Sequence, residues 1–555
     1  MEAVLTALQA GVTAVHQQEA NWYAPAPLRL AVVCALADGA DQLVAEAGLA
    51  AGFELHAVLP FDRDLTRRDL VEAGSDGFGR LLARATRTLE LPGTLADKEA
   101  AYAMAGRAIV AHSTVLIAVW DGLAARGPGG TAEVVAGALA AGTPVVHVPL
   151  QAHHPLRVLW RGFDPLGSHE LDAAPSRPLG ALPQVLTTVL APPADPAERR
   201  ALADYFAERQ RRVRHRLEFH LLQWVTGVRA LRRRDIKVPP YAQITAEEWS
   251  SFRARCATGE GVIAQLDELE AAYSWADGLA QHFAQFHRSG HVFNFVVGAA
   301  SVLIALATLL WPAGKAPLAV TETLLILAII ANTRAGTASA WQRRWLDYRQ
   351  LAERLRPLRS LSLLGIARPQ VADNAHLRWT DWYSAAAWRA VGPPAGKLDG
   401  AGAAALAHAL AEEELAPQVA YHRASAHRGE QLDHRLHIAG TWLFGLTLAG
   451  CIVLLASLAL FPHWTKENAK LFVALSAGLP AVGTAIFGIR MQGDFSGTAR
   501  RSLVTAAKLE AIAVEVRRGG PPGRQASLFE TASAAMVSDL DQWRQEHAKH
   551  ELMLP

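Results

Sequence analysis

The chain has 555 residues, of which 51% are hydrophobic and 19% charged, with a formal net charge of +2. This length favours several domains, and a charge so close to zero argues against nucleic acid as a bulk electrostatic partner. The three cysteines, Cys34, Cys256 and Cys451, are far apart and lack metal-ligand spacing, which suits a reducing compartment.

Residues 1 to about 150 alternate between predicted helices and predicted strands. The first helix, 2–19, lacks the basic and apolar regions of a secretory signal. The expected strands are 28–35, 54–59, 86–91, 115–120 and 144–148, and the expected intervening helices are 38–51, 75–85, 97–111 and 130–141. The run LRLAVVCA at 28–35 is apolar throughout, as in a strand buried on both faces. The alternation predicts a Rossmann-like, doubly wound parallel sheet that binds ligands at the carboxyl ends of its strands.

The middle of the chain connects this sheet to apolar segments. Residues 150–195 are proline-rich and predicted to be irregular. Residues 198–234 read as one basic helix, either solvated beside a membrane or in contact with anionic lipid head groups. A further helix, 261–288, is expected to lead straight into the first apolar segment.

Two pairs of long apolar segments predict four membrane spans. The first pair is 292–312 and 317–332, and the second is 438–461 and 471–489. About 20 apolar residues cross a hydrocarbon core of roughly 30 Å as a helix. The alternative is a buried helix pair in a water-soluble core, but apolar runs of this length are typical of spanning helices.

Basic residues indicate the orientation of these spans. The short connecting loops hold only Lys315 in one case, and Lys466 and Lys470 in the other. The opposite ends of the spans are rich in arginine: Arg288, Arg334, Arg343, Arg344, Arg435, Arg490, Arg500 and Arg501. The positive-inside rule therefore predicts that both termini and the soluble regions are cytoplasmic. The helix–span–span–helix pattern occurs twice, so we expect a pseudo-dimeric unit and a homo-oligomer.

A glycine-rich turn lies between the strand 115–120 and the next helix. Gly127, Pro128, Gly129 and Gly130 precede Thr131, which opens that helix. Free backbone N–H groups at such a turn can hold a phosphate, and the threonine can cap the helix or donate to a phosphate oxygen. The same pattern also occurs in turns that bind nothing.

The stretch GPGGTAEVV resembles the PGG-x-GT-x-x-E signature of the lysine-decarboxylase-like, LOG-type proteins of the SLOG superfamily. ALADGADQLVAEAGLAAGFELHAVLPF is similar to the strand–helix–strand that follows a phosphate loop in those proteins, and AYAMAGRAIVAHSTVLIAVWDG resembles their arginine-bearing helix. The likeness covers roughly residues 1–150. It implies a ligand site made of Gly39, Asp41, Arg107, Asp121, Gly129, Gly130, Thr131 and Glu133.

In the LOG enzymes, the residues matching Arg107 and Glu133 take part in splitting an N-glycosidic bond of a nucleotide. The resemblance thus implies that Arg107 clamps a phosphate or ribose and that Glu133 binds ribose hydroxyls or stabilises an oxocarbenium ion. The structural alternatives are a surface arginine for Arg107, a first-turn carboxylate favoured by the helix dipole for Glu133, and a helix cap for Asp41.

Two departures from the family pattern favour sensing over catalysis. The GPGGT stretch lacks the extra residue and the second glycine of PGG-x-GT, and the strand that precedes the first helix in related proteins is not seen before residue 2. We expect no cofactor and no metal, but a nucleotide-derived ligand. Histidines such as His422 and His427 read as surface residues, because no partner carboxylate or cysteine accompanies them.

The apolar half resembles the SLATT type of two-span unit, which accompanies SLOG domains in bacterial conflict systems. The resemblance implies a nucleotide-sensing pore or membrane-disrupting effector of an anti-phage system in the bacterial inner membrane. The alternatives are a membrane-tethered hydrolase of nucleotides or NAD, and a membrane scaffold with a degenerate SLOG domain. The expected domains are 1–195 (ligand sensing), 196–290 (helical connector), 291–365 (first hairpin and exit helix), 366–436 (helical), 437–518 (second hairpin and exit helix) and 519–555 (terminal helix).

Overall fold

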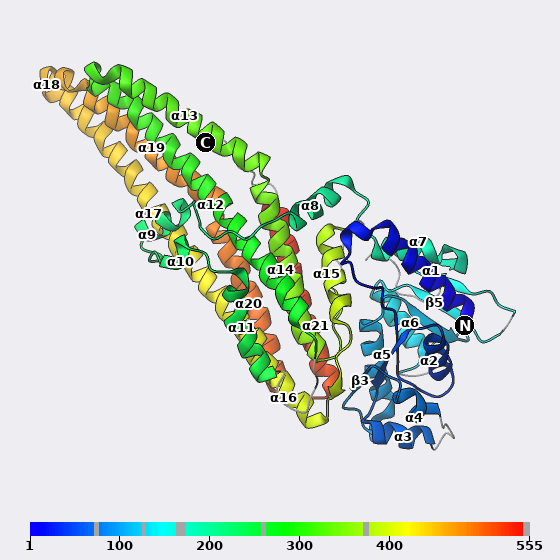
Figure 1. Cartoon of the computed structure of the whole chain (residues 1–555). Helices are drawn as coiled ribbons and strands as arrows, with labels where there is room; N and C mark the ends of the chain where they lie inside the picture. Colours follow the sequence, from blue (N-terminus) through cyan, green and yellow to red (C-terminus); the bar gives the residue numbers. More distant parts are fainter. Residues whose placement is uncertain are drawn as a thin grey trace.

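The computed structural model describes residues 1–71, 77–124, 129–151, 153–162, 174–256, 262, 264–369 and 377–547. An α/β region, blue and cyan in Figure 1, lies beside a long bundle of helices drawn in green, yellow and red. The described residues thus combine a mixed α/β amino-terminal region with a helical carboxyl-terminal region, as the sequence predicts.

Two four-stranded sheets form the α/β region. The first has the order β1-β2-β3-β8 and consists of the parallel strands β1 (Ala31–Cys34), β2 (Glu54–Leu59), β3 (Arg87–Glu90) and β8 (Gly396–Lys397). The second has the order β4-β5-β6-β7, with β4 (Leu116–Trp120), β5 (Val145–Pro149), β6 (Arg157–Leu159) and β7 (Ser176–Pro178). Only β4 and β5 are parallel there. The prediction of parallel strands is confirmed, but no backbone pairing joins β1 to β4 among the described residues, so the single sheet is replaced by two.

Helices cover the strands on both faces. They are α1 (Glu2–Gln18), α2 (Ala40–Ala50), α3 (Arg63–Val71), α4 (Gly77–Leu82), α5 (Lys98–Ala111), α6 (Thr131–Ala140) and α7 (Leu182–Leu190). Leu55 and Leu59 of β2 pack with Val44 of α2, whereas the intervening Val58 packs with Ala105 of α5. Successive side chains of a strand point to opposite faces, so the apolar runs in the sequence follow from burial on both sides.

The helical region is built around two central helices, α12 and α14. Its helices are α8 (Pro196–Phe206), α9 (Glu218–Val225), α10 (Arg233–Ile236), α11 (Tyr241–Cys256), α12 (Asp267–Leu310), α13 (Lys315–Ala338), α14 (Trp341–Leu363), α15 (Trp379–Val391), α16 (Gly400–Leu410), α17 (Ala416–Leu460), α18 (Pro462–Glu467), α19 (Ala469–Gly493), α20 (Phe495–Arg517) and α21 (Pro522–His547). A π-helical turn, Ala411–Leu415, connects α16 to α17. Every residue of α14 from Gln350 to Leu363 is buried, so this helix is enclosed by its neighbours.

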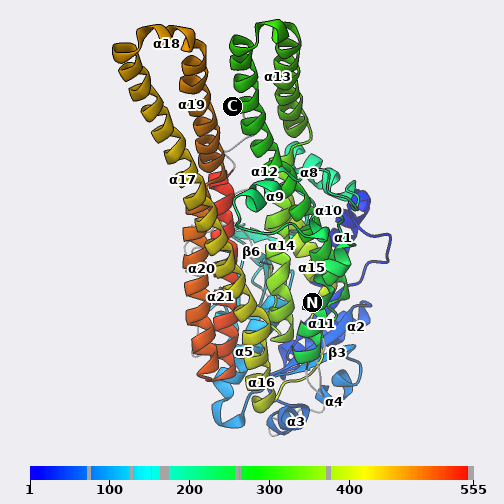
Figure 2. The same cartoon turned by 90° about the vertical axis from the view of Figure 1, so that its left-hand side faces the viewer.

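Four of these helical stretches are long and apolar enough to cross a membrane. Two hairpins, α12–α13 and α17–α19, project away from the rest of the molecule and diverge toward their tips (Figure 2). Only 6% to 22% of each apolar window is buried, so most of these side chains face outward. Such exposure suits lipid and does not suit a water-soluble core.

The two hairpins share a backbone irregularity that matches the repeat seen in the sequence. Ala340, with φ 48°, lies two residues after the end of the first hairpin's return helix, and Asp494, with φ 38°, lies directly after the end of the second's. Both residues adopt the left-handed conformation, and an exit helix begins immediately after each. The exit helices α14 and α20 therefore start at equivalent kinks.

The arginine-rich segment 198–234 is not one helix, and that prediction is wrong. α8 ends at Phe206, and the chain is then extended enough for Arg214 N–H to donate to the carbonyl of Ile236 at 2.8 Å. Arg216 there has tertiary partners: its side chain donates to Asn332 at 2.6 Å, and its carbonyl accepts from the Gln285 side chain at 3.1 Å. These contacts with distant groups outweigh local helix propensity.

Candidate ligand site

A cavity of about 1040 Å³ lies between β1 and β4. Residues 28–35 line it without interruption on one side, and residues 112–119 do so on the other. A cavity beneath one face of a strand would be lined by alternate residues, because successive side chains point to opposite faces. The uninterrupted runs therefore place this cavity along the open edges of the two strands, in the gap between the sheets.

The carboxyl end of the cavity holds three of the residues predicted from the sequence, Asp41, Gly129 and Thr131. The carboxylate of Asp41 accepts the backbone N–H groups of Ala35 at 3.1 Å and Ala37 at 3.3 Å. It therefore fastens the turn after β1 and does not cap α2, whose N-cap residue is Gly39. Burial raises the pKa of Asp41.

The glycine-rich turn lies against α5. Gly129 has φ 78°, and a Cβ there would stand 2.9 Å from the carbonyl oxygen of Glu99, so both conformation and space require glycine. Its N–H donates to the carboxylate of Glu133 at 2.5 Å. Gly130 is the N-cap of α6, and Thr131 is its first residue. Gly127 and Pro128 of the predicted loop lie outside the described residues.

The remaining predicted residues do not line the cavity. Gly39 has φ 86° in an open turn, and Asp121 accepts the N–H of Leu123 at 3.0 Å. Arg107 projects from α5 toward the helical region, where it forms a 2.7 Å ion pair with Glu530 of α21. The structure thus brings Asp41, Gly129 and Thr131 together, keeps Gly130 and Glu133 beside them, and separates Arg107 from the group.

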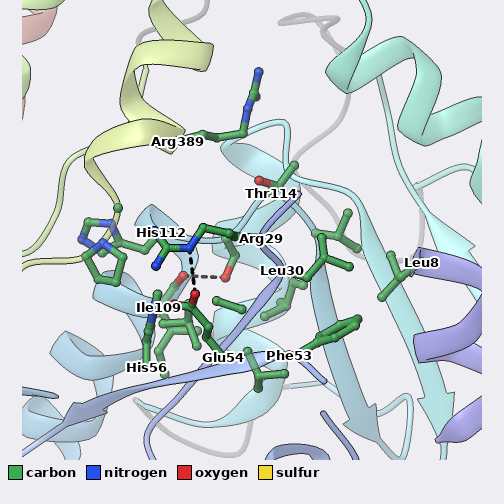
Figure 3. Close-up of a pocket in the computed structure, with 18 of the residues that line it drawn as sticks. Leu8, Arg29, Leu30, Phe53, Glu54, His56, Ile109, His112, Thr114 and Arg389 are labelled. Atoms are coloured by element: carbon green, nitrogen blue, oxygen red, sulfur yellow. Dashed lines mark hydrogen bonds and ion pairs between the residues drawn. The ribbon is translucent and has the colours of Figure 1, made fainter. Parts of the chain in front are cut away.

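The amino end of the cavity carries polar residues that the sequence analysis did not single out. Figure 3 shows Arg29, Glu54, His56 and His112 grouped there, with Arg29 Nε 3.0 Å from a Glu54 carboxylate oxygen. Burial lowers the pKa of His112 to about 4, and burial also lowers the pKa of His56. A histidine inside the apolar strand 54–59 was the one sequence signal that could have indicated this group.

The helical region closes part of the same cavity. Residues Trp382, Tyr383, Trp388 and Arg389 of α15 belong to its lining, and Arg389 extends from α15 at the rim in Figure 3. Nearby, Arg87 of β3 donates to the carbonyl of Val391 at 2.9 Å. A molecule that reaches this part of the cavity would therefore touch both the strands and the helical region.

The residues at the carboxyl end of the cavity suit an anion that is attached to a planar ring. The amino terminus of α6 presents free N–H groups and the positive end of the helix dipole, and the Thr131 hydroxyl adds a donor. Apolar strand residues alongside can contact a base or another ring. This arrangement can bind a phosphorylated ligand without a metal ligand set.

Comparison with known proteins finds one family model, described as a protein of unknown function (DUF4231), over residues 271–361. These residues run from α12 through α13 into α14, the first hairpin with its flanking helices. No curated protein and no solved structure matches the chain. The match covers a minor part of the chain and describes no activity, so the SLOG and SLATT likenesses stay resemblances.

Proposed function

We propose that this protein senses a nucleotide-derived ligand and controls the permeability of the bacterial inner membrane through its four apolar helical stretches. The observation that carries the proposal is the composition of the cavity wall. Strand residues such as Val33 and Ile117 line it together with Trp382 and Arg389 of α15. A ligand that extends from the strand ends to α15 acts on both regions at once, which is what a sensor joined to an effector requires.

The first route from the cavity to the hairpins runs through α15. This helix packs against α12, which forms one arm of the first hairpin, and against α14, which follows the hairpin. Its N-cap residue Arg378 forms a 2.7 Å ion pair with Asp347 of α14, and Trp388 Nε1 donates to the carbonyl of Ala367 at 2.8 Å. Both pairs are buried, so a shift of α15 would be transmitted to α14.

A second route runs through α5. The glycine-rich turn rests on this helix at Gly129, and Arg107 on the same helix pairs with Glu530 of α21. α21 packs against both α14 and α20, the two exit helices. A ligand that moves the turn would therefore bias α5, then α21, and finally the ends of both hairpins.

The SLOG-like and SLATT-like features support the remaining parts of the proposal. A soluble nucleotide sensor joined to two-span units fits a conflict-system effector that harms the infected cell. Arginines gathered at one end of the hairpins support cytoplasmic termini, and hairpins with so much exposed apolar surface support assembly as a homo-oligomer.

The test is leakage from liposomes that contain the purified protein. A panel of nucleotides and nucleotide-derived messengers is added, and dye or ion release is measured. Gly130→Trp should abolish ligand-dependent leakage, because Gly130 precedes the α6 amino terminus and a large side chain would cover the anion site. Gly180→Trp is the matched control, since a Cβ there points into open space and the residue is far along the chain from the glycine-rich turn.

Three outcomes separate the candidate functions. Leakage that depends on one nucleotide and on Gly130 supports the sensor. Release of free base from a nucleotide or NAD, lost in Glu133→Ala, would instead identify the tethered hydrolase. If no nucleotide shifts the melting temperature and Gly130→Trp leaves the leakage unaltered, the result supports the remaining alternative, a membrane scaffold with a degenerate SLOG domain.

A further inference from the structure

The edge of β1 that faces the cavity carries unpaired backbone groups. Glu54 N–H donates to the carbonyl of Leu30 at 2.8 Å, so Leu30, Val32 and Cys34 direct their backbone groups to β2. The residues between them, Ala31 and Val33, direct N–H and C=O into the cavity. No described group of the protein accepts or donates there.

The facing edge of β4 has the same property. Leu116 N–H donates to the carbonyl of Pro144 at 2.9 Å, so Leu116 and Ala118 direct their backbone groups to β5. Val115, Ile117 and Val119 therefore face the cavity, again with no partner among the described residues. Two open strand edges thus oppose each other across one gap, a condition that folded proteins normally avoid.

The two strands run in the same direction. β3 is followed by α5 and then β4, and a helical crossover of this kind returns the chain to the same end of the sheet. β4 is therefore parallel to β3, and through β2 to β1. An occupant that pairs with both edges must present hydrogen-bond donors and acceptors alternately to β1 on one side and to β4 on the other. It must do so over a length of about six residues.

The faces of the gap restrict the occupant further. Leu5 and Leu8 of α1 cover one side, and Ile109 of α5 and Val134 of α6 contribute on the other. The occupant must therefore be apolar above and below its own plane. A nucleotide or a lipid chain does not present backbone-like groups along both edges, whereas an extended apolar peptide does.

We propose that the gap between β1 and β4 binds an extended, apolar segment of polypeptide, about six residues long, which runs parallel to both strands and joins the two sheets into one. This segment would end beside the amino end of α1, because Met1 packs in the same cluster as Leu36 after β1 and Val119 of β4. The anion site at the carboxyl end stays open above it, but the segment would cover Val33 and Ile117, so a ligand at that end would then act through the glycine-rich turn and α5. The inference does not depend on the proposed function.

The test joins a strand to the full chain. The sequence Val-Leu-Ile-Ala-Val-Trp, copied from residues 115–120, is fused ahead of Met1 through Gly-Asn-Gly, so that its effective concentration at the gap is high. Hydrogen exchange at the amides of Val33, Ile117 and Val119 should slow by at least about tenfold. The melting temperature should rise by about 5 °C.

The control is the same extension with proline at its second and fourth residues, which keeps the apolar character but removes two N–H donors. The proposal is overturned if both extensions protect these amides equally, or if neither extension protects them. A second measurement adds the free peptide, with a lysine tail for solubility, to the natural chain. The protection of the same amides is then compared with the protection given by the proline form of the peptide. If millimolar AMP or ATP alone protects Val33 and Val119 as fully as the peptide does, the whole gap is a small-molecule site and the proposal fails.

Discussion

Replacing Glu414 by glutamine is expected to reduce the free energy of unfolding by about 3 kcal/mol, because it leaves a buried arginine charge poorly compensated. Glu414 lies in the π-helical turn before α17, and its carboxylate oxygen is 2.7 Å from Arg359 Nε on α14. Their side chains are 2% and 1% exposed. The pair therefore joins the exit helix of the first hairpin to the approach of the second.

The magnitude follows from what remains around Arg359. Removal of one partner from a buried ion pair typically costs about 3–5 kcal/mol. Glu248 also lies 2.7 Å from Arg359, but its side chain is 40% exposed, so solvent weakens its compensation. Glutamine keeps the size and an acceptor oxygen for the Ser360 hydroxyl, which donates to Glu414 at 3.0 Å. The expected cost thus lies at the lower end of that range.

The assay is reversible unfolding of the full chain in mixed micelles, followed by circular dichroism during titration with SDS. Glu248→Gln is the matched control, because it removes the exposed carboxylate from the same arginine and should cost less than about 1 kcal/mol. The double variant Arg359→Leu with Glu414→Leu removes both charges and should recover much of the lost stability. Equal costs for the two glutamine variants, or a double variant weaker than Glu414→Gln, would refute the reasoning.

Three further predictions use other features of the fold. Ala340→Gly should raise the free energy of unfolding by about 1 kcal/mol in the same titration, because Ala340 has a left-handed backbone conformation that favours glycine. Asp494→Gly should give no such gain, because the Asp494 carboxylate accepts a helix N–H, an interaction that glycine cannot replace. A gain at both sites would contradict this reasoning. Burial lowers the pKa of His112 from 6.5 to about 4, so its stabilising contribution is complete above pH 6.5 and is lost as the pH falls toward 4. His112→Gln should therefore flatten the fall in melting temperature over that window, and an unchanged slope counts against it. A cysteine at Lys315 should react with an impermeant maleimide in intact cells and a cysteine at Arg500 only after permeabilisation; the reverse pattern would invert the proposed orientation.

Local patterns predicted the elements that local physics determines. β2 occupies 54–59, as the alternation of strands and helices predicts, and α6 begins at Thr131 directly after the glycines. The long apolar helices were equally visible, because about 20 uncharged residues in sequence have few other uses. In each case the residues that specify the element are the residues that form it.

Features that depend on distant partners were not predictable. Arg107 looked like a ligand clamp, but its ion pair with Glu530 joins residues more than 400 positions apart. The cavity wall from α15 and the pairing of β3 with the two-residue strand β8 likewise need the folded helical region. The gap between β1 and β4 is visible only when the hydrogen-bonding direction of each strand is known.

The pairing of β8 with β3 has a consequence for synthesis of the chain. Leu89 and Glu90 leave the ribosome about 300 residues before Gly396 and Lys397, which at 5–20 residues per second is a delay of roughly 15–60 s. The first hairpin is translated within that interval. The β3 edge of the nascent α/β region therefore stays unpaired until the whole first apolar hairpin has been synthesised, which makes this edge a natural place for a chaperone to bind.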